Sequence, residues 1–295
     1  MQLTRRDILE HQQAVPWPNV RQVEQDLLLC QSMIALFNDD FLQSQVAMRG
    51  GTLLHKVHLA PASRYSEDID LVIFGDRPDD HISKAIRRVL GDVLGKPTFS
   101  AWEDIKLAVR NAVKPSKVLR ETYHVQSIAD PGGKPLEIVV EVNATERTPY
   151  KEIAQLPFEL KLRNQTHKAM IRGFDIHEML GTKMRALFQR TRGRDLFDLY
   201  WAMTKLTEPV DPAGIIDAFQ HYMDQEKSEA GRNDFIDALS IKLTDKGFLS
   251  DMTPLLRTGL TYDPKIAGEY VTQNLLMLIP EDASTPPPPA GDRMS

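Results

Sequence analysis

The stretch that decides the fold is Asp68-Ile69-Asp70-Leu71-Val72-Ile73-Phe74. It begins with alternating acidic and apolar residues and then becomes wholly apolar, which is typical of a buried β-strand. Gly75 and Pro78 follow it, and both residue types favour a turn. Residues two apart in a strand point to the same face, so we expect the carboxylates of Asp68 and Asp70 to project side by side.

This pair of aspartates suggests a metal site. Two carboxylates side by side on an apolar strand repel each other, and the repulsion is costly unless a positive charge lies between them. A magnesium ion, or manganese in its place, relieves it, because such ions bind carboxylates together with substrate phosphates. Two metal ions about 4 Å apart are the usual arrangement for nucleotidyl transfer. An Asp-x-Asp pair alone also occurs on exposed strand edges, so this interpretation depends on the surrounding residues.

Upstream of the pair, Gly50-Gly51 opens a short predicted helix over 52–57. Two glycines at a helix start let backbone N–H groups approach a phosphate, and the helix N-terminus adds positive potential. Ser66, two residues before the first aspartate, is placed to hydrogen-bond a phosphate. The chain has no Gly-x-x-x-x-Gly-Lys-[Ser/Thr] loop and no His-Arg-Asp kinase signature. P-loop and protein-kinase functions therefore lack support.

Apolar periodicity predicts further elements around this strand. We expect helices over 19–37 and 81–94, and strands over 118–119 with 122–128 and over 136–143. From about Thr166 to near residue 280 the pattern is helical, with Asp175 as an N-cap and a break at Arg192-Gly193-Arg194.

The predicted fold class is therefore α+β. Residues 1–165 are expected to form a mixed sheet flanked by helices, and residues 166–280 a helical domain. Residues 281–295, which include four consecutive prolines, are expected to be a disordered tail.

Composition limits the class of protein. The 295 residues are 42% hydrophobic and 26% charged, as in soluble globular proteins, and are enough for one large or two ordinary domains. No apolar run reaches the roughly 18 residues of a membrane span, and no export signal is visible. Cys30 is the only cysteine, which excludes an internal disulfide and a cysteine-rich zinc site. We expect a cytoplasmic protein without a membrane partner.

Charge is unevenly distributed along the chain. The net charge of −5 argues against non-specific coating of nucleic acid. Residues 161–194, however, hold nine lysines and arginines against two acids, a balance of +7. From residue 208 to the end there are fifteen acids and seven basic residues, a balance of −8. The basic stretch either guides a polyanion to one place or is a solvated helix face.

Two blocks of sequence resemble a known family. The first joins Met48-Arg49-Gly50-Gly51-Thr52-Leu53-Leu54 to Arg64-Tyr65-Ser66-Glu67-Asp68-Ile69-Asp70-Leu71. The second joins Lys183-Met184-Arg185-Ala186-Leu187 to Arg192-Gly193-Arg194-Asp195-Leu196-Phe197-Asp198-Leu199-Tyr200. With the strand between them they span roughly residues 46–202. They are similar to the AbiEii/AbiGii toxins, nucleotidyltransferases of the DNA polymerase β-like superfamily that include the MenT toxins.

The resemblance implies roles for single residues. Asp68 and Asp70 would bind metal, and Ser66 would contact the nucleotide phosphates. Lys183 would contact the nucleotide, which suits the compact charge of an ammonium group. Asp198 would support catalysis.

The superfamily usually adds a third metal-binding carboxylate from a later strand. Glu141 is the candidate, because it is central in the strand over 136–143. Glu137, at the start of the same strand, is the competitor.

Other polar residues have more than one interpretation. Arg190, Arg192 and Arg194 either grip RNA phosphates or interact with a helix end. Arg194 is also spaced to pair with Asp198. His55, His58 and His177 lack metal-ligand spacing and are interpreted as structural.

The resemblance predicts a Mg²⁺-dependent toxin with an NTP as substrate. It would add pyrimidine nucleotides to the 3′ end of tRNA and so block translation, and its partner would be an antitoxin of the type IV, AbiEi-like kind. One alternative keeps the fold but transfers the nucleotide to a protein or small molecule. Another is a protein that binds nucleotide or a partner without turnover.

Overall fold

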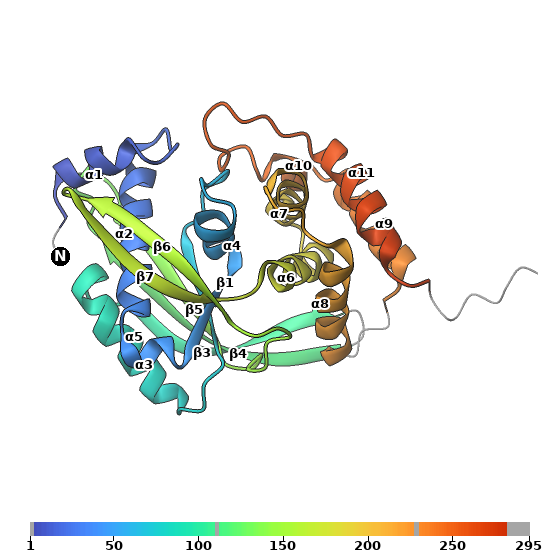
Figure 1. Cartoon of the computed structure of the whole chain (residues 1–295), viewed down its shortest axis with the longest axis horizontal. Helices are drawn as coiled ribbons and strands as arrows, with labels where there is room; N and C mark the ends of the chain where they lie inside the picture. Colours follow the sequence, from blue (N-terminus) through green and yellow to red (C-terminus); the bar gives the residue numbers. More distant parts are fainter. Residues whose placement is uncertain (1–2, 110–111, 227–229, 282–295) are drawn as a thin grey trace, which may run out of the picture.

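A seven-stranded mixed sheet places the Asp68–Asp70 strand at its centre (Figure 1). The computed structural model describes residues 3–109, 112–226 and 230–281. The strand order is β3-β4-β5-β2-β1-β7-β6. The strands are β1 (Val46–Arg49), β2 (Asp68–Ile73), β3 (Phe99–Val109), β4 (Ala112–Val125), β5 (Leu136–Asn143), β6 (Ala154–Leu162) and β7 (Gln165–Gly173).

The register of the central strands brings charged residues together. β2 runs antiparallel to β1, and Asp70 lies opposite Arg49. On its other side β2 runs parallel to β5, which puts Asp70 opposite Glu141 and Asp68 opposite Val139. Because side chains alternate along a strand, these residues share one face of the sheet.

The opposite face of the sheet carries the first layer of helices. These are α1 (Arg5–Gln12), α2 (Val20–Phe37), α3 (Asp40–Gln43) and α5 (Asp79–Leu94). α2 and α5 pack against each other and against the strands (Figure 1). Ile69, Leu71 and Ile73 of β2 are buried in this core. The apolar residues of β2 therefore anchor the strand that presents the two aspartates.

The second half of the chain forms a helical layer on the aspartate side of the sheet (Figure 1). α6 packs against α7 and α8, and α11 packs against α7. The elements of this layer are α6 (Ile176–Gln189), α7 (Gly193–Lys205), α8 (Pro212–Gln225), α9 (Arg232–Lys242), α10 (Lys246–Ser250), α11 (Pro264–Asn274) and the 3₁₀-helix η2 (Leu276–Leu278). Two short helices from the first half of the chain, α4 (Gly50–Leu53) and the π-helix η1 (Leu54–His58), lie between β1 and β2 in sequence. Within the described ranges, none of the helices has the length and apolar character needed to cross a bilayer.

Buried polar contacts hold the helical layer to the sheet. The carboxylate of Glu178 on α6 is fully buried and accepts the main-chain N–H of Tyr150 at 2.7 Å and the hydroxyl of Tyr222 at 2.5 Å. Arg185, also on α6, donates to Glu146, in the segment after β5, at 2.7 Å. These contacts fix the distance between α6 and the strands.

Most predicted elements are confirmed. The α+β class is correct, and α2, α5, β2 and β5 lie where the periodicity places them. Asp175 caps α6 by accepting the N–H of His177 at 2.9 Å, and α7 begins at the predicted break, Gly193.

The helix expected from about Thr166 is wrong. Residues 165–173 form β7, which pairs with β6 in a hairpin, and the helical region begins only at Ile176. Arg163 and Asn164 both have positive φ, 54° and 58°, and make the two-residue turn between the strands. Gly and Asn are the usual residues at such turns, so an arginine there hides the hairpin. The predicted tail lies outside the described residues from position 282 on.

Candidate active site

Gly50 and Gly51 form a turn in which the main chain passes close to the side chain of Asp70. Gly50 follows β1 with φ of +78°, and a Cβ there would lie 1.8 Å from Oδ2 of Asp70. A Cβ on Gly51 would lie 2.6 Å from Nη2 of Arg64 and 3.0 Å from Oγ of Ser66. Both glycines are therefore required by neighbouring side chains, whatever ligand binds there.

Thr52 fixes the start of α4 to the aspartate strand. Its side chain is fully buried, and Oγ1 donates to the main-chain carbonyl of Asp68 at 2.5 Å. The same oxygen lies 2.9 Å from Oγ of Ser66. The glycine turn, Ser66 and the first aspartate therefore form one local unit.

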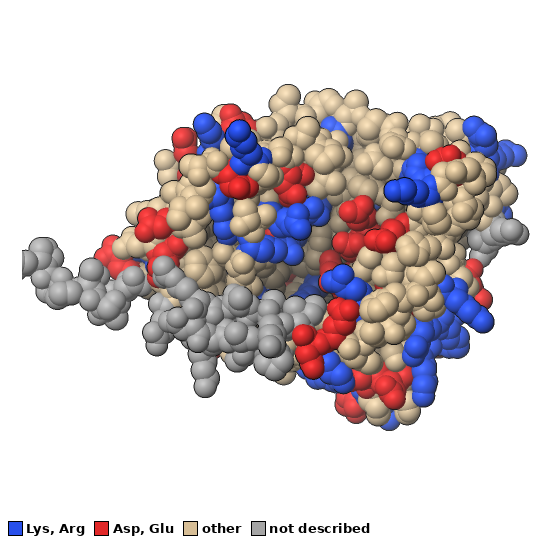
Figure 2. Space-filling view, turned by 180° about the vertical axis from the view of Figure 1, so that it is seen from behind, with Lys and Arg blue, Asp and Glu red and all other residues tan. Residues whose placement is uncertain are grey.

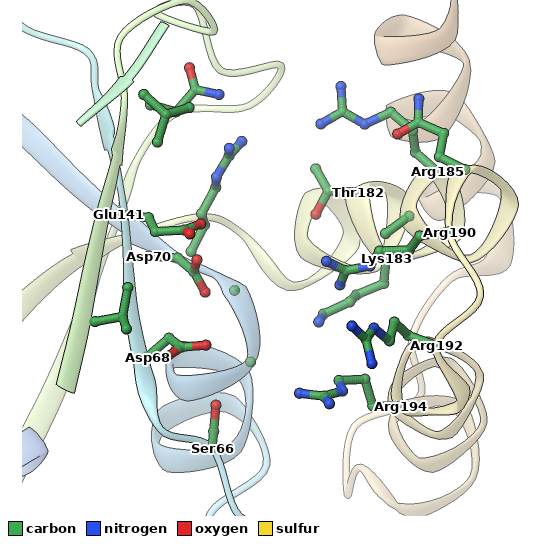
Figure 3. A pocket seen from close by; sticks show the side chains of 18 of the residues that line it. Ser66, Asp68, Asp70, Glu141, Thr182, Lys183, Arg185, Arg190, Arg192 and Arg194 are labelled. Carbon is green, nitrogen blue, oxygen red and sulfur yellow. The ribbon is translucent and has the colours of Figure 1, made fainter. Parts of the chain in front are cut away.

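A cavity of about 570 Å³ separates this unit from helices α6 and α7. Figure 3 shows Asp68, Asp70 and Glu141 projecting from the sheet toward the opposite wall, which α6, α7 and the turn between them form. The labelled basic residues of that wall are Lys183, Arg185, Arg190, Arg192 and Arg194. From outside, Figure 2 shows a hollow in the surface with basic residues on one side and acidic residues on the other. The charged residues lining the cavity are Arg49, Arg64, Asp68, Asp70, Arg120, Glu141, Glu146, Lys183, Arg185, Arg190, Arg192 and Arg194.

The acidic wall of the cavity concentrates negative charge. Burial, together with the charges of Asp70, Glu67 and Glu141, raises the pKa of Asp68 to about 7. Burial and the charge of Asp70 also raise the pKa of Glu141. Arg120 offsets part of this charge by donating to Oε1 of Glu141 at 2.5 Å.

The structure brings Glu141, and not Glu137, to the two aspartates. Glu137 lies four residues earlier on the same face of β5, does not line this cavity, and is 3.2 Å from Nε2 of His124.

The basic wall is held by acids that lie behind it. Nζ of Lys183 is 2.9 Å from Asp198 and 3.4 Å from Asp195. Arg190 makes two hydrogen bonds to Asp195, at 2.7 and 2.8 Å. Because Asp195 and Asp198 are fully buried, they orient these cations without facing the cavity themselves.

Asp198 connects three segments of the chain. Arg64 donates to both its oxygens, at 2.6 and 2.7 Å, and Nε2 of His55 lies 2.8 Å from Oδ1. Burial alone would raise the pKa of Asp198, but the charges of Arg64 and Lys183 hold it well below its usual range. The Arg194–Asp198 pair expected from spacing is wrong, because Arg194 pairs with Asp251 instead.

Comparisons with known proteins identify the family. A profile of the nucleotidyl transferase AbiEii toxin, type IV toxin–antitoxin system, matches residues 33–269. The chain belongs to this family. It is a nucleotidyltransferase toxin of the AbiEii type, and membership of a type IV toxin–antitoxin family implies an antitoxin partner.

One solved structure supports the fold of this AbiEii chain. MenT4, a nucleotidyltransferase toxin from Mycobacterium tuberculosis H37Rv, is similar with a TM-score of 0.59 and 16% identity, over 94% of this chain and 90% of that one. A putative nucleotidyltransferase from H. pylori has a TM-score of 0.44 and 13% identity, over 88% of this chain and 97% of that one. No curated protein matches the chain.

The acidic wall of this AbiEii toxin fits a divalent cation. Asp68, Asp70 and Glu141 offer only carboxylate oxygens, the donors that Mg²⁺ prefers, and burial together with the neighbouring carboxylates raises the pKa of Asp68. A divalent cation would offset this negative charge, which Arg120 offsets only at Glu141. A second group, His11, Asp26 and Cys30, brings ligand atoms within 4.8 Å of one another. In this second group the ammonium of Lys56 already pairs with Asp26, so a positive charge already occupies the place a metal ion would take.

Sequence reasoning missed two residues of this AbiEii site. Arg64 was visible inside the first motif, but nothing in its spacing indicated that it reaches Asp198, 134 residues later. Arg120 faces Glu141 only because β4 pairs with β5. His55 was assigned a structural role, and its burial beside Asp198 agrees with that role.

Proposed function

We propose that this toxin transfers nucleotides from an NTP, preferably a pyrimidine, to the 3′ end of tRNA. One observation carries the proposal: a single cavity has a carboxylate wall on the sheet and a cationic wall on the helices (Figure 3). The carboxylates match divalent cations, and the cations match a polyphosphate. A nucleoside triphosphate with its metal ions requires both.

Each wall has a separate task in the transfer. Asp68, Asp70 and Glu141 would hold Mg²⁺, and its chemistry there would be to activate the attacking hydroxyl and to neutralise charge on the leaving pyrophosphate. Lys183 binds the β- and γ-phosphates, with the amides of Gly50–Gly51 and the hydroxyl of Ser66 beside them.

The reaction is an in-line displacement. The terminal hydroxyl oxygen of the acceptor attacks the α-phosphorus, a new P–O bond forms, and the bond to pyrophosphate breaks. The hydroxyl proton goes to solvent. The chain contributes position and charge, as is usual for this chemistry.

Two observations support an RNA acceptor. Five of the nine basic residues in the stretch over 161–194 line the cavity: Lys183, Arg185, Arg190, Arg192 and Arg194. The family is one of toxins, and blocking tRNA aminoacylation would stop growth. A blocked 3′ end has that effect.

Labelled NTPs test the proposal. Each of the four NTPs is incubated separately with tRNA and Mg²⁺, and we expect label on the RNA when the NTP is a pyrimidine nucleotide. Asp68→Asn or Asp70→Asn should abolish labelling and toxicity while the chain stays folded. Asp92→Asn, an exposed acid on α5, is the control and should act like the wild type. Undiminished labelling by the aspartate variants would exclude these residues as the metal site.

The same reaction separates the alternatives. Label on protein in a lysate depleted of tRNA, with none on tRNA, would indicate a protein acceptor. Binding of NTP and Mg²⁺ in a thermal-shift titration without any label transfer would indicate a protein that binds without turnover.

A further inference from the structure

A second cavity, of about 440 Å³, lies directly beside the first. The two cavities share Asp68 and Val139 as lining residues. Asp68 therefore stands at their common wall. The volume of the second cavity lies within the range of roughly 300–1,000 Å³ that holds small ligands.

The two cavities follow one another along a single strand face. On β5, Glu137 lines the second cavity, Val139 lines both, and Glu141 lines the first. With a rise of about 3.3 Å per residue, Glu137 and Glu141 are roughly 13 Å apart. A substrate that spans this distance passes Asp68 at the midpoint.

The charges of the two cavities differ. The first contains the cationic wall that suits a triphosphate. In the second, Arg21 is the one basic residue among the described lining residues, and it is engaged by Asp130 at 3.1 Å and by the carbonyl of Lys134 at 2.5 Å. Glu67 and Glu137 also line it, so it disfavours a phosphate group.

The lining of the second cavity instead suits an uncharged group that forms hydrogen bonds. The N-cap and first turns of α2 contribute the side-chain amides of Asn19, Gln22 and Gln25. Oδ1 of Asn19 accepts the N–H of Arg21 at 2.9 Å and Nε2 of Gln25 donates to the carbonyl of Glu137 at 2.7 Å, so their other polar atoms and the amide of Gln22 are the groups offered to a ligand. Tyr65 is 3% exposed, and its phenol oxygen is buried without a hydrogen-bond partner among the described residues. Leu255 adds apolar surface. Amides and a phenol can hydrogen-bond the edges of a base and the hydroxyls of a ribose.

We propose that the second cavity binds the terminal nucleoside of an RNA acceptor strand. This inference rests on the proposed function, and it adds where the acceptor RNA binds and which side chains bind it. In-line transfer puts the attacking hydroxyl and the leaving pyrophosphate on opposite sides of the α-phosphorus. With the pyrophosphate against the cationic wall, the attacking hydroxyl approaches past Asp68 from the second cavity.

Paired variants test the acceptor subsite kinetically. Gln22→Leu and Tyr65→Phe keep side-chain volume but remove hydrogen-bonding groups, so each should raise the KM for acceptor RNA about fivefold. The KM for the NTP should stay within about twofold. Tyr65→Phe removes an unpartnered hydroxyl, so its unfolding midpoint should not fall.

Matched controls are available on the same chain. Gln31→Leu lies on α2 but does not line either cavity, and Tyr262→Phe removes another buried hydroxyl that lacks a partner among the described residues. Both should leave the acceptor KM unchanged. An acceptor KM that is the same in the cavity variants and the controls would overturn the subsite while leaving RNA labelling, and the proposed function, intact.

A binding measurement tests the location without turnover. A short RNA with 4-thiouridine as its 3′ nucleotide, irradiated with the full chain in EDTA, should cross-link to residues 19–25 or 135–139. Cross-links confined to α6 and α7 would overturn the location. If the wild type labels protein and no RNA at all, both the RNA acceptor and this inference fail.

Discussion

At the scale of single residues, Gly50 shows how closely the site is packed. Gly50→Ala would place a methyl group 1.8 Å from Oδ2 of Asp70, in a backbone conformation with φ of +78°. We expect it to lose transfer activity and to destabilise the fold by more than the roughly 1–2 kcal/mol of a positive φ alone. Gly95→Ala is the control, because Gly95 has φ of +81° with no atom within 4 Å of its Cβ. Urea unfolding and labelling assays that give equal losses for both would contradict this explanation.

Asp68 gives a prediction about pH. Its pKa in the folded chain is about 7, against an ordinary value of 3.8, so between these values the folded state holds a proton that the unfolded state has released. Stability of the metal-free protein therefore falls as pH rises from about 4 to 7. In EDTA at pH 8, Asp68→Asn should be more stable than the wild type by about 1–3 kcal/mol, discounted for partial exposure, and the gain should vanish near pH 4. A gain independent of pH would show that the cost of burying the Asp68 charge beside other carboxylates is not the cause.

Single residues were also where sequence reasoning succeeded best. Asp68 and Asp70 are two residues apart in one strand, and strand geometry alone places their side chains on one face. Glu141 required a second strand, and alternation along β5 places Glu137 on the same face, so the strand pattern alone left both as candidates. Arg120 could not be found this way, because its position depends on how β4 pairs with β5.

At the scale of elements, the π-helix η1 and α7 meet at Asp198. Asp198→Asn removes the charge that holds Arg64, Lys183 and His55, and it leaves buried cations without compensation. We expect a loss of about 3–5 kcal/mol in the free energy of unfolding. In the fraction that stays folded, the KM for NTP should rise while the KM for acceptor RNA stays the same, because Lys183 and Arg64 line the first cavity and not the second.

The control for Asp198→Asn breaks an ion pair whose charged atoms are equally close but exposed to solvent. Glu159 pairs with Lys168 at 2.6 Å on the exposed side of the β6–β7 hairpin. Glu159→Gln should leave the unfolding midpoint almost unchanged, because water screens exposed pairs. Equal destabilisation by both variants would contradict the assignment of Asp198 as the buried centre of the site.

The same scale explains the largest error of sequence analysis. β6 and β7 alternate between buried and exposed residues, and charged side chains occupy several of the exposed positions. Lysines and arginines on β7 and α6 therefore appeared to be one basic helical stretch. Sheet pairing, rather than local preference, makes this segment a strand, because β7 pairs with β6 along its whole length. Met48 and Gly173 then pair β7 with β1.

At the scale of the whole molecule, the site depends on the helical layer closing over the sheet. Arg49 of β1 and Arg185 of α6 both pair with Glu146, so this carboxylate bridges the two walls. No sequence pattern predicts such closure, because residues 49, 146 and 185 are far apart in the chain. The position of Lys183 opposite Asp68 could not be derived from the motifs for the same reason.

This closure concentrates positive charge in a protein whose net charge is −5. Binding of single-stranded RNA should therefore be local and strongly salt-dependent, with a log–log slope of about −0.7 for each phosphate contact. Arg192 is exposed and lines the cavity, so Arg192→Ala should make the slope less negative by about 0.7. Lys84→Ala removes an exposed charge from α5, on the opposite face of the sheet, and should leave the slope unchanged. Fluorescence anisotropy with a labelled tRNA acceptor-end RNA between 50 and 300 mM salt, about a sixfold range, measures both slopes. If the two variants shift the slope equally, RNA binds to the overall surface charge and not to the first cavity.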